Sequence, residues 1–160
     1  MIIGVIGSGT MGQGIAQIAA TQGHQVILYD VSDDALKNGQ RKISKILNRL
    51  VEKGRLEKSD AEGINERISF SQSLKQLRNC GFVIEAIIEN LDIKKKVFGE
   101  LESLVADDCI LATNTSSLSV ASIAAACNNP HRVVGVHFFN PAPLMKLVEI
   151  IPAIQTAPQT

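Results

Sequence analysis

The chain has 160 residues, a length that fits one domain. Its 16 basic and 16 acidic residues cancel, so no overall field attracts nucleic acid or an anionic membrane surface, and an anionic ligand must be held by local groups. No apolar run approaches the roughly 18 residues of a membrane span. The three cysteines are odd in number and lack a CxxC pair, and the chain opens on an apolar strand without a basic leader. We therefore expect a cytoplasmic protein with free thiols, without a metal site and without a nucleic-acid or membrane partner.

Short β-branched runs alternate with longer helical patterns along the chain, which is typical of βαβ units around a parallel sheet. Strands are expected at 2–6, 25–29, 67–70, 82–86, 109–112, 132–136 and 144–151. Helices are expected at 11–22, 33–53, 59–64, 93–105 and 119–126. This order predicts a Rossmann-type, doubly wound α/β fold with a mostly parallel sheet, in one domain that spans residues 1–160.

A glycine-rich turn joins the first strand to the first helix, and it reads Gly7-Ser8-Gly9-Thr10-Met11-Gly12. A GxGxxG pattern alone is weak, but between a strand and a helix it predicts a dinucleotide site. The first glycine permits the tight turn, the second lets the backbone approach a pyrophosphate, and the third lets the helix pack closely on its strand. The helix N-terminus offers amide groups to the phosphates, which is the local attraction that a neutral chain needs.

Asp30 ends the second expected strand, 23 residues after Gly7 and close to the usual spacing of about 20. Its carboxylate would accept hydrogen bonds from the adenosine ribose and repel a 2′-phosphate, and no arginine follows at Val31 or Ser32. The pattern therefore predicts NAD as the cofactor and disfavours NADP. A structural glycine turn beside an exposed capping aspartate is the alternative.

Two polar segments near the C-terminus lie in apolar surroundings. The first, 112–118, comes directly after an expected strand, where open α/β sheets bind ligands, although Ser117 or Ser119 could instead cap the next helix. His137 follows the next strand, and Glu149 lies on the last apolar run. An imidazole can take the hydroxyl proton of a secondary alcohol as hydride leaves, and a carboxylate can orient it. The competing interpretation is a structural, hydrogen-bonded histidine and an unrelated exposed glutamate.

Five motifs taken together resemble those of one known family. They are GSGTMGQGIA at 7–16, EAIIEN at 85–90, NTSSL at 114–118, HFFNPAP at 137–143 and MKLVE at 145–149. In this order they resemble the short-form L-3-hydroxyacyl-CoA dehydrogenases over essentially the whole chain, in particular the bacterial 3-hydroxybutyryl-CoA dehydrogenases. HFFNP followed by MKLVE is far more specific than the glycine turn. The resemblance implies NAD-dependent oxidation of L-3-hydroxyacyl-CoA, or reduction of 3-ketoacyl-CoA such as acetoacetyl-CoA, in fatty acid β-oxidation or butanoate metabolism.

The resemblance also implies roles for the residues of the catalytic half. His137 would be the general base and Glu149 its partner. Ser116 would hydrogen-bond the substrate and help to hold its oxygen during the reaction. Asn114 would lie near the nicotinamide.

Three further residues receive ligand contacts from the resemblance alone. Glu89 and Lys94 would contact NAD, and Lys53, late in the second helix, would contact CoA. A surface lysine is the alternative for Lys94, and a solvated helix end is the alternative for Lys53.

Members of this family continue into an all-helical second domain that completes the acyl-CoA site and provides much of a homodimer interface. Residues 152–160 have turn and polar character without a helix. We expect a domain truncated near its C-terminal end, with the helical domain absent, that binds NAD but is weakly active or inactive alone. Two other interpretations are a non-catalytic NAD-binding protein and a 3-hydroxyacid dehydrogenase of the 6-phosphogluconate dehydrogenase-like type, which uses a lysine and lacks HFFNP.

Overall fold

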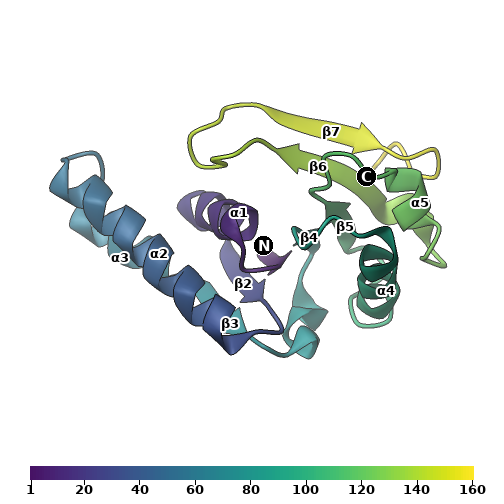
Figure 1. Cartoon of the computed structure of the whole chain (residues 1–160), viewed down its shortest axis with the longest axis horizontal. Coiled ribbons are helices and arrows are strands. Elements are labelled where there is room, and N and C mark those ends of the chain that lie inside the picture. Colours follow the sequence, from purple (N-terminus) through teal and green to yellow (C-terminus); the bar gives the residue numbers. More distant parts are fainter.

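A computed structural model describes residues 1–160, which form one seven-stranded sheet with helices on both faces (Figure 1). The strands are β1 (Ile2–Ile6), β2 (Gln25–Tyr29), β3 (Ile68–Ser71), β4 (Phe82–Glu85), β5 (Ile110–Thr113), β6 (Val133–Phe138) and β7 (Val148–Pro152). They lie in the order β3-β2-β1-β4-β5-β6-β7, and only β7 runs antiparallel to its neighbour. The first six strands have the doubly wound order of dinucleotide-binding folds, so the predicted fold class is confirmed.

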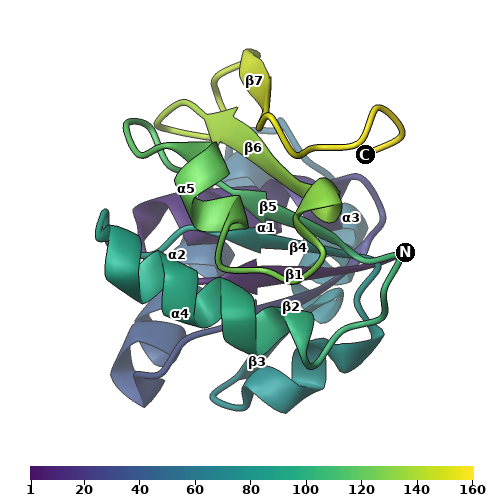
Figure 2. The same ribbon diagram turned by 90° about the vertical axis from the view of Figure 1, so that its right-hand side faces the viewer.

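The helices form two layers, one on each face of the sheet. They are α1 (Thr10–Thr21), α2 (Asp33–Glu52), α3 (Lys58–Glu66), α4 (Leu91–Glu102) and α5 (Val120–Ala124), with 3₁₀ turns η1 (Leu74–Asn79) and η2 (Pro130–Arg132). Figure 2 shows α4 and α5 on one side of the sheet and α1 to α3 on the other. Consecutive residues of a buried strand serve opposite faces, so Val5 packs in the core beneath α1 to α3 and Ile6 in the core beneath α4 and α5. No helix is both long and apolar enough to cross a bilayer.

Most boundaries agree with the sequence pattern to within a few residues, and two differences have clear causes. Helix α4 begins at Leu91 because the Asn90 side chain caps it, accepting a hydrogen bond from the Ile93 amide at 3.1 Å. The last expected strand, 144–151, is wrong over its first half. The amides of Leu144 and Met145 both donate to the Pro141 carbonyl, so this apolar stretch forms a turn and β7 begins only at Val148.

Residues after β7 turn back along the start of β6. The Ala157 amide donates to the His131 carbonyl at 2.8 Å, and the Thr156 hydroxyl donates to the Val133 carbonyl at 2.6 Å. The sheet edge on which β7 lies is thus joined to the rest of the domain at both of its ends, by the 139–147 turn and by this returning segment.

Candidate functional site

The turn between β1 and α1 depends on two glycines whose side-chain positions are filled by backbone. Gly7 has a φ of +100°, and a Cβ there would lie 2.6 Å from the Ala86 carbonyl oxygen. A Cβ on Gly12 would lie 1.7 Å from the Gly7 oxygen. Gly9 differs, because a Cβ there would meet nothing within 4 Å. The space over Gly9 is therefore open for a ligand that approaches the backbone.

Helix α1 begins directly at this turn without a side-chain cap on its first amides. The amides of Thr10, Met11 and Gly12 are the first of the helix, which have no partner within it. Free amides at the positive end of a twelve-residue helix form a site for phosphate. This geometry supports the predicted pyrophosphate contacts.

Asp30 and Ser8 hold the turn in shape. The Ser8 amide donates to Asp30 Oδ2 at 2.7 Å, and the Ser32 amide donates to Asp30 Oδ1 at 3.0 Å. The buried Ser8 hydroxyl donates to the Ala35 carbonyl of α2 at 3.0 Å. Both donors of Ser8 are thus occupied within the protein, so its predicted NAD contact has no free amide or hydroxyl proton to offer. Each Asp30 oxygen keeps acceptor capacity for a ribose hydroxyl.

A cavity of about 340 Å³ lies at the C-terminal ends of β4, β5 and β6. Its lining includes Met11, Glu89, Lys94, Asn114, Ser116 and His137, together with Phe138 and Phe139. Residues that are distant in the sequence therefore meet at the edge where open α/β sheets bind ligands. Asp30 and Lys53 do not line this cavity, and Glu149 reaches it only through His137.

His137 and Glu149 lie directly opposite each other in the antiparallel ladder of β6 and β7. His137 Nδ1 and Glu149 Oε2 are 2.8 Å apart, and the side chains are 17% and 50% exposed. His137 was expected just after its strand, but β6 extends to Phe138 and includes it. Since a carboxylate only accepts, Nδ1 carries the proton and Nε2 keeps the lone pair that a general base needs. The geometry supports a dyad over two unrelated residues.

Asn114 and Ser116 extend from the end of β5 into the same cavity. Asn114 Oδ1 accepts a hydrogen bond from the Phe138 amide at 2.8 Å, which orients its NH₂ group and ties this segment to the strand that bears His137. Ser116 is exposed, whereas the buried Thr115 hydroxyl donates to Glu89 Oε2 at 2.7 Å. The Ser119 side chain caps α5 by accepting a hydrogen bond from the Ser122 amide. The predicted alternative, in which one serine caps the next helix, therefore applies to Ser119.

Lys94 is not a surface residue, so the alternative interpretation of it is wrong. Its side chain is 1% exposed, and Nζ lies 2.5 Å from Glu85 Oε1 and 4.0 Å from Glu89 Oε1. Glu85 is fully buried at the end of β4, and its role was not predicted from the sequence. A carboxylate at the end of an apolar strand must be paired to be tolerated, and that signal could have identified it.

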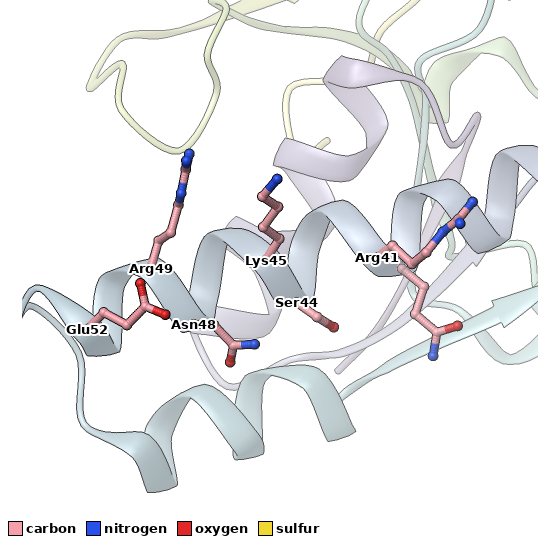
Figure 3. A pocket seen from close by; sticks show the side chains of 7 residues that line it. Arg41, Ser44, Lys45, Asn48, Arg49 and Glu52 are labelled. Atoms are coloured by element: carbon pink, nitrogen blue, oxygen red, sulfur yellow. The ribbon is translucent and has the colours of Figure 1, made fainter.

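Lys53 is exposed just after α2. Other basic side chains on this helix border cavities instead. One of about 570 Å³ is lined by Arg41, Lys45 and Arg49 among polar neighbours, and one of about 320 Å³ places Lys45 and Arg49 near α1 and Pro143. Figure 3 shows Lys45 and Arg49 extending from α2 toward α1 and the loop that precedes β7. This face of α2 can hold an anionic group.

Comparisons with known proteins agree with this geometry. The family model described as "3-hydroxyacyl-CoA dehydrogenase, NAD binding domain" matches residues 2–160. The chain is 46% identical to 3-hydroxyadipyl-CoA dehydrogenase of Escherichia coli over 97% of this chain and 33% of that protein. It is 44% identical to a probable 3-hydroxybutyryl-CoA dehydrogenase of Bacillus subtilis over 98% of this chain and 54% of that protein. The crystal structure of 3-hydroxybutyryl-CoA dehydrogenase from E. coli K12 superposes with a TM-score of 0.98 at 45% identity, covering 99% of this chain and 34% of that one. The chain thus spans between about a third and about half of the length of these relatives.

Proposed function

The chain belongs to the family of 3-hydroxyacyl-CoA dehydrogenase NAD-binding domains, and from this premise we propose that it oxidises L-3-hydroxyacyl-CoA to 3-ketoacyl-CoA with NAD. The same site would catalyse the reverse reduction, for example of acetoacetyl-CoA, in fatty acid or butanoate metabolism. The observation that carries the proposal is the 2.8 Å contact between His137 and Glu149 beside the cavity that Ser116 lines. The names of the E. coli and B. subtilis relatives support an acyl-CoA substrate.

In this reaction, His137 takes the proton of the substrate 3-hydroxyl at Nε2 as the C3–H bond breaks. Glu149 stabilises the imidazolium that forms, because its carboxylate already accepts from Nδ1 at 2.8 Å. Ser116 donates a hydrogen bond to the substrate oxygen, and the Asn114 NH₂ group faces the reacting end. NAD, when bound, supplies the hydride acceptor.

The residues of the β1–α1 turn fit NAD. The open space over Gly9 and the first amides of α1 would hold the pyrophosphate, and Asp30 would hold the adenosine ribose. Glu89 and Lys94, which line the cavity beside His137, would contact the other end of the dinucleotide.

The CoA moiety of the substrate is assigned to the basic face of α2. Its phosphates would lie near Lys45 and Arg49, which border a cavity shared with the 140–143 loop, and Lys53 is the further candidate one turn on. In the chain joined to the C-terminal part of the B. subtilis relative, Lys45→Gln, Arg49→Gln and Lys53→Gln should each raise the KM for acetoacetyl-CoA and leave kcat unchanged. If a substitution leaves this KM unchanged, the substituted residue does not contact CoA.

The family resemblance implies an all-helical domain, and we propose that this domain completes the acyl-CoA site and forms a homodimer. Exposed apolar side chains gather at the β7 edge, at Leu144, Leu147, Ile150 and Ile154. Several exposed apolar side chains on one sheet edge are typical of a surface that another polypeptide covers. We also propose a cytoplasmic location, which the three unpaired cysteines favour. Light scattering of this chain joined to the C-terminal part of the B. subtilis relative would test the homodimer. Fractionation of cells would test the location.

The test of function begins with this chain and extends to a joined protein. Calorimetry should detect NAD binding to residues 1–160. NADH-dependent reduction of acetoacetyl-CoA is then measured for the chain alone and for the chain joined to the C-terminal part of the B. subtilis relative. The joined protein should turn over, and His137→Ala should lose a factor of about 10² to 10⁴ in kcat while it still binds NAD.

His24→Ala, in the turn before β2, is the matched control and should keep its rate. A folded joined protein that binds NAD but does not reduce acetoacetyl-CoA would contradict the proposed activity. Turnover that is indifferent to His137→Ala would contradict the assigned base. A chain that binds NAD but gives no active joined protein would fit the non-catalytic alternative.

A further inference from the structure

Glu85 is a buried carboxylate that the proposed reaction does not use. It ends β4, is fully buried, and faces the cavity only through its partners. An ionised carboxylate in such a position costs several kcal/mol of desolvation unless its charge and its lone pairs are all matched. The structure matches them with partners from three separate segments.

Both oxygens of the Glu85 carboxylate are occupied. Oε1 accepts from the Ile87 amide at 2.7 Å and from Lys94 Nζ at 2.5 Å, and Oε2 accepts from the Thr113 hydroxyl at 2.7 Å. One side chain therefore joins the β4–α4 loop, the first turn of α4 and the end of β5.

This carboxylate sets where the Lys94 ammonium lies. Nζ has two other oxygens near it, the Ile87 carbonyl at 3.5 Å and Glu89 Oε1 at 4.0 Å, and both are more distant than Glu85. Lys94 and Glu89 line the cavity that also contains His137 and Ser116, so the ammonium is held at the reacting end of the site. Asp30 and Gly9 do not line that cavity.

We propose that Glu85 is a positioning residue of the cofactor site, which holds Lys94 against the nicotinamide half of the dinucleotide. The inference rests on the proposed function. Glu85 touches neither ligand nor substrate, and it acts through Lys94 and through the Ile87 and Thr113 contacts that shape the loop around it. Binding of the adenosine half, at the turn after β1 and at Asp30, does not depend on it.

The experiment compares two ligands, NAD and ADP, because ADP lacks both the nicotinamide and its ribose and so reports the adenosine half alone. Calorimetry on the 160-residue chain gives a Kd for each ligand. Glu85→Gln keeps the size and most hydrogen bonds of the side chain but removes the charge opposite Lys94. NAD affinity should fall by about tenfold or more, as expected for the loss of a charged hydrogen-bonded contact, while ADP affinity changes less than about twofold.

Two further variants separate positioning from general damage. Glu66→Gln removes the same charge from an exposed position at the end of α3 and should change neither Kd. In a Lys94→Met background, adding Glu85→Gln should not lower the NAD affinity further, because the group that Glu85 positions is already gone. The double variant also removes the buried charges as a pair, so it provides the comparison if Glu85→Gln alone does not fold.

The outcomes distinguish this inference from the proposed function. If the unaltered chain binds neither ligand, the cofactor assignment fails and the inference fails with it. If the unaltered chain binds both ligands but Glu85→Gln weakens both equally, or neither, only the role of Glu85 is overturned. Additive losses in the Lys94→Met background would also overturn it.

Discussion

Asp30 holds the β1–α1 turn through both of its carboxylate oxygens and is also the proposed ribose acceptor. Spacing from the glycine turn predicts that it accepts hydrogen bonds from the ribose, but its contacts with the Ser8 and Ser32 amides were not visible in the sequence. They arise because β1 and β2 are adjacent parallel strands, so that the ends of both strands meet. A substitution at Asp30 therefore disturbs the turn as well as the ribose site.

We predict that Asp30→Ala reduces the preference for NAD over NADP, because the charge that repels a 2′-phosphate is lost. NAD affinity should fall by about tenfold, consistent with the loss of a charged acceptor. Calorimetry with both nucleotides measures the change. Asp30→Asn is the matched variant, since it keeps one acceptor for the backbone amides. If Asp30→Asn keeps the full preference for NAD over NADP, that preference is not caused by repulsion between the Asp30 charge and the 2′-phosphate.

At the scale of elements, the β1–α1 turn was predictable because its requirements are local. Gly7 has a positive φ, a Cβ on Gly12 would clash with the Gly7 carbonyl oxygen of the same turn, and a Cβ on Gly9 would meet no protein atom within 4 Å. Only the close approach of the Ala86 carbonyl oxygen to Gly7 comes from a distant segment. The turn before β7 was not predictable in this way. An apolar run favours a strand, whereas the actual path of 144–147 is set by hydrogen bonds to the Pro141 carbonyl.

We predict opposite consequences for alanine at two glycines of this turn. Gly12→Ala places a Cβ against the Gly7 carbonyl oxygen, so it should destabilise the fold by more than about 2 kcal/mol and abolish NAD binding. Gly9→Ala meets no protein atom, so it should leave the unfolding free energy within about 0.5 kcal/mol and weaken NAD binding by obstructing the pyrophosphate. Urea unfolding and calorimetry on both variants test this. Undiminished NAD affinity in Gly9→Ala would remove the pyrophosphate from that position.

At the scale of the whole molecule, one of the two cores encloses the thiols of this chain. The three cysteines are free and buried, all in the core beneath α4 and α5. Burial raises the pKa of Cys80 to about 12, and burial likewise raises the pKa of Cys109 and of Cys127 to about 11. These thiols are therefore poor nucleophiles in the folded protein.

The raised thiol pKa values predict a loss of stability at alkaline pH. Thiols in the unfolded chain titrate near pH 8.5, so above about that pH the unfolded state releases protons that the folded state keeps. The unfolded state then binds fewer protons, and the free energy of unfolding should fall as pH rises from about 8.5 to about 11. Urea unfolding at about pH 7.5 and about pH 10 measures the fall. Cys80→Ala should show a smaller fall than the unaltered chain, and an equal fall would mean that Cys80 does not contribute to it.

The sequence by itself determined the parts of this protein whose requirements are met within a few residues. The glycine turn follows from local backbone sterics, and the alternation of strands and helices follows from the period of apolar residues. Tertiary structure decided the pairings between segments. His137 meets Glu149 because β7 runs antiparallel to β6 in one particular register, and a shift of one residue would turn Glu149 to the opposite face. Lys94 is buried rather than exposed because β4 ends in Glu85, and a buried charge is stable only where the fold brings its opposite within reach.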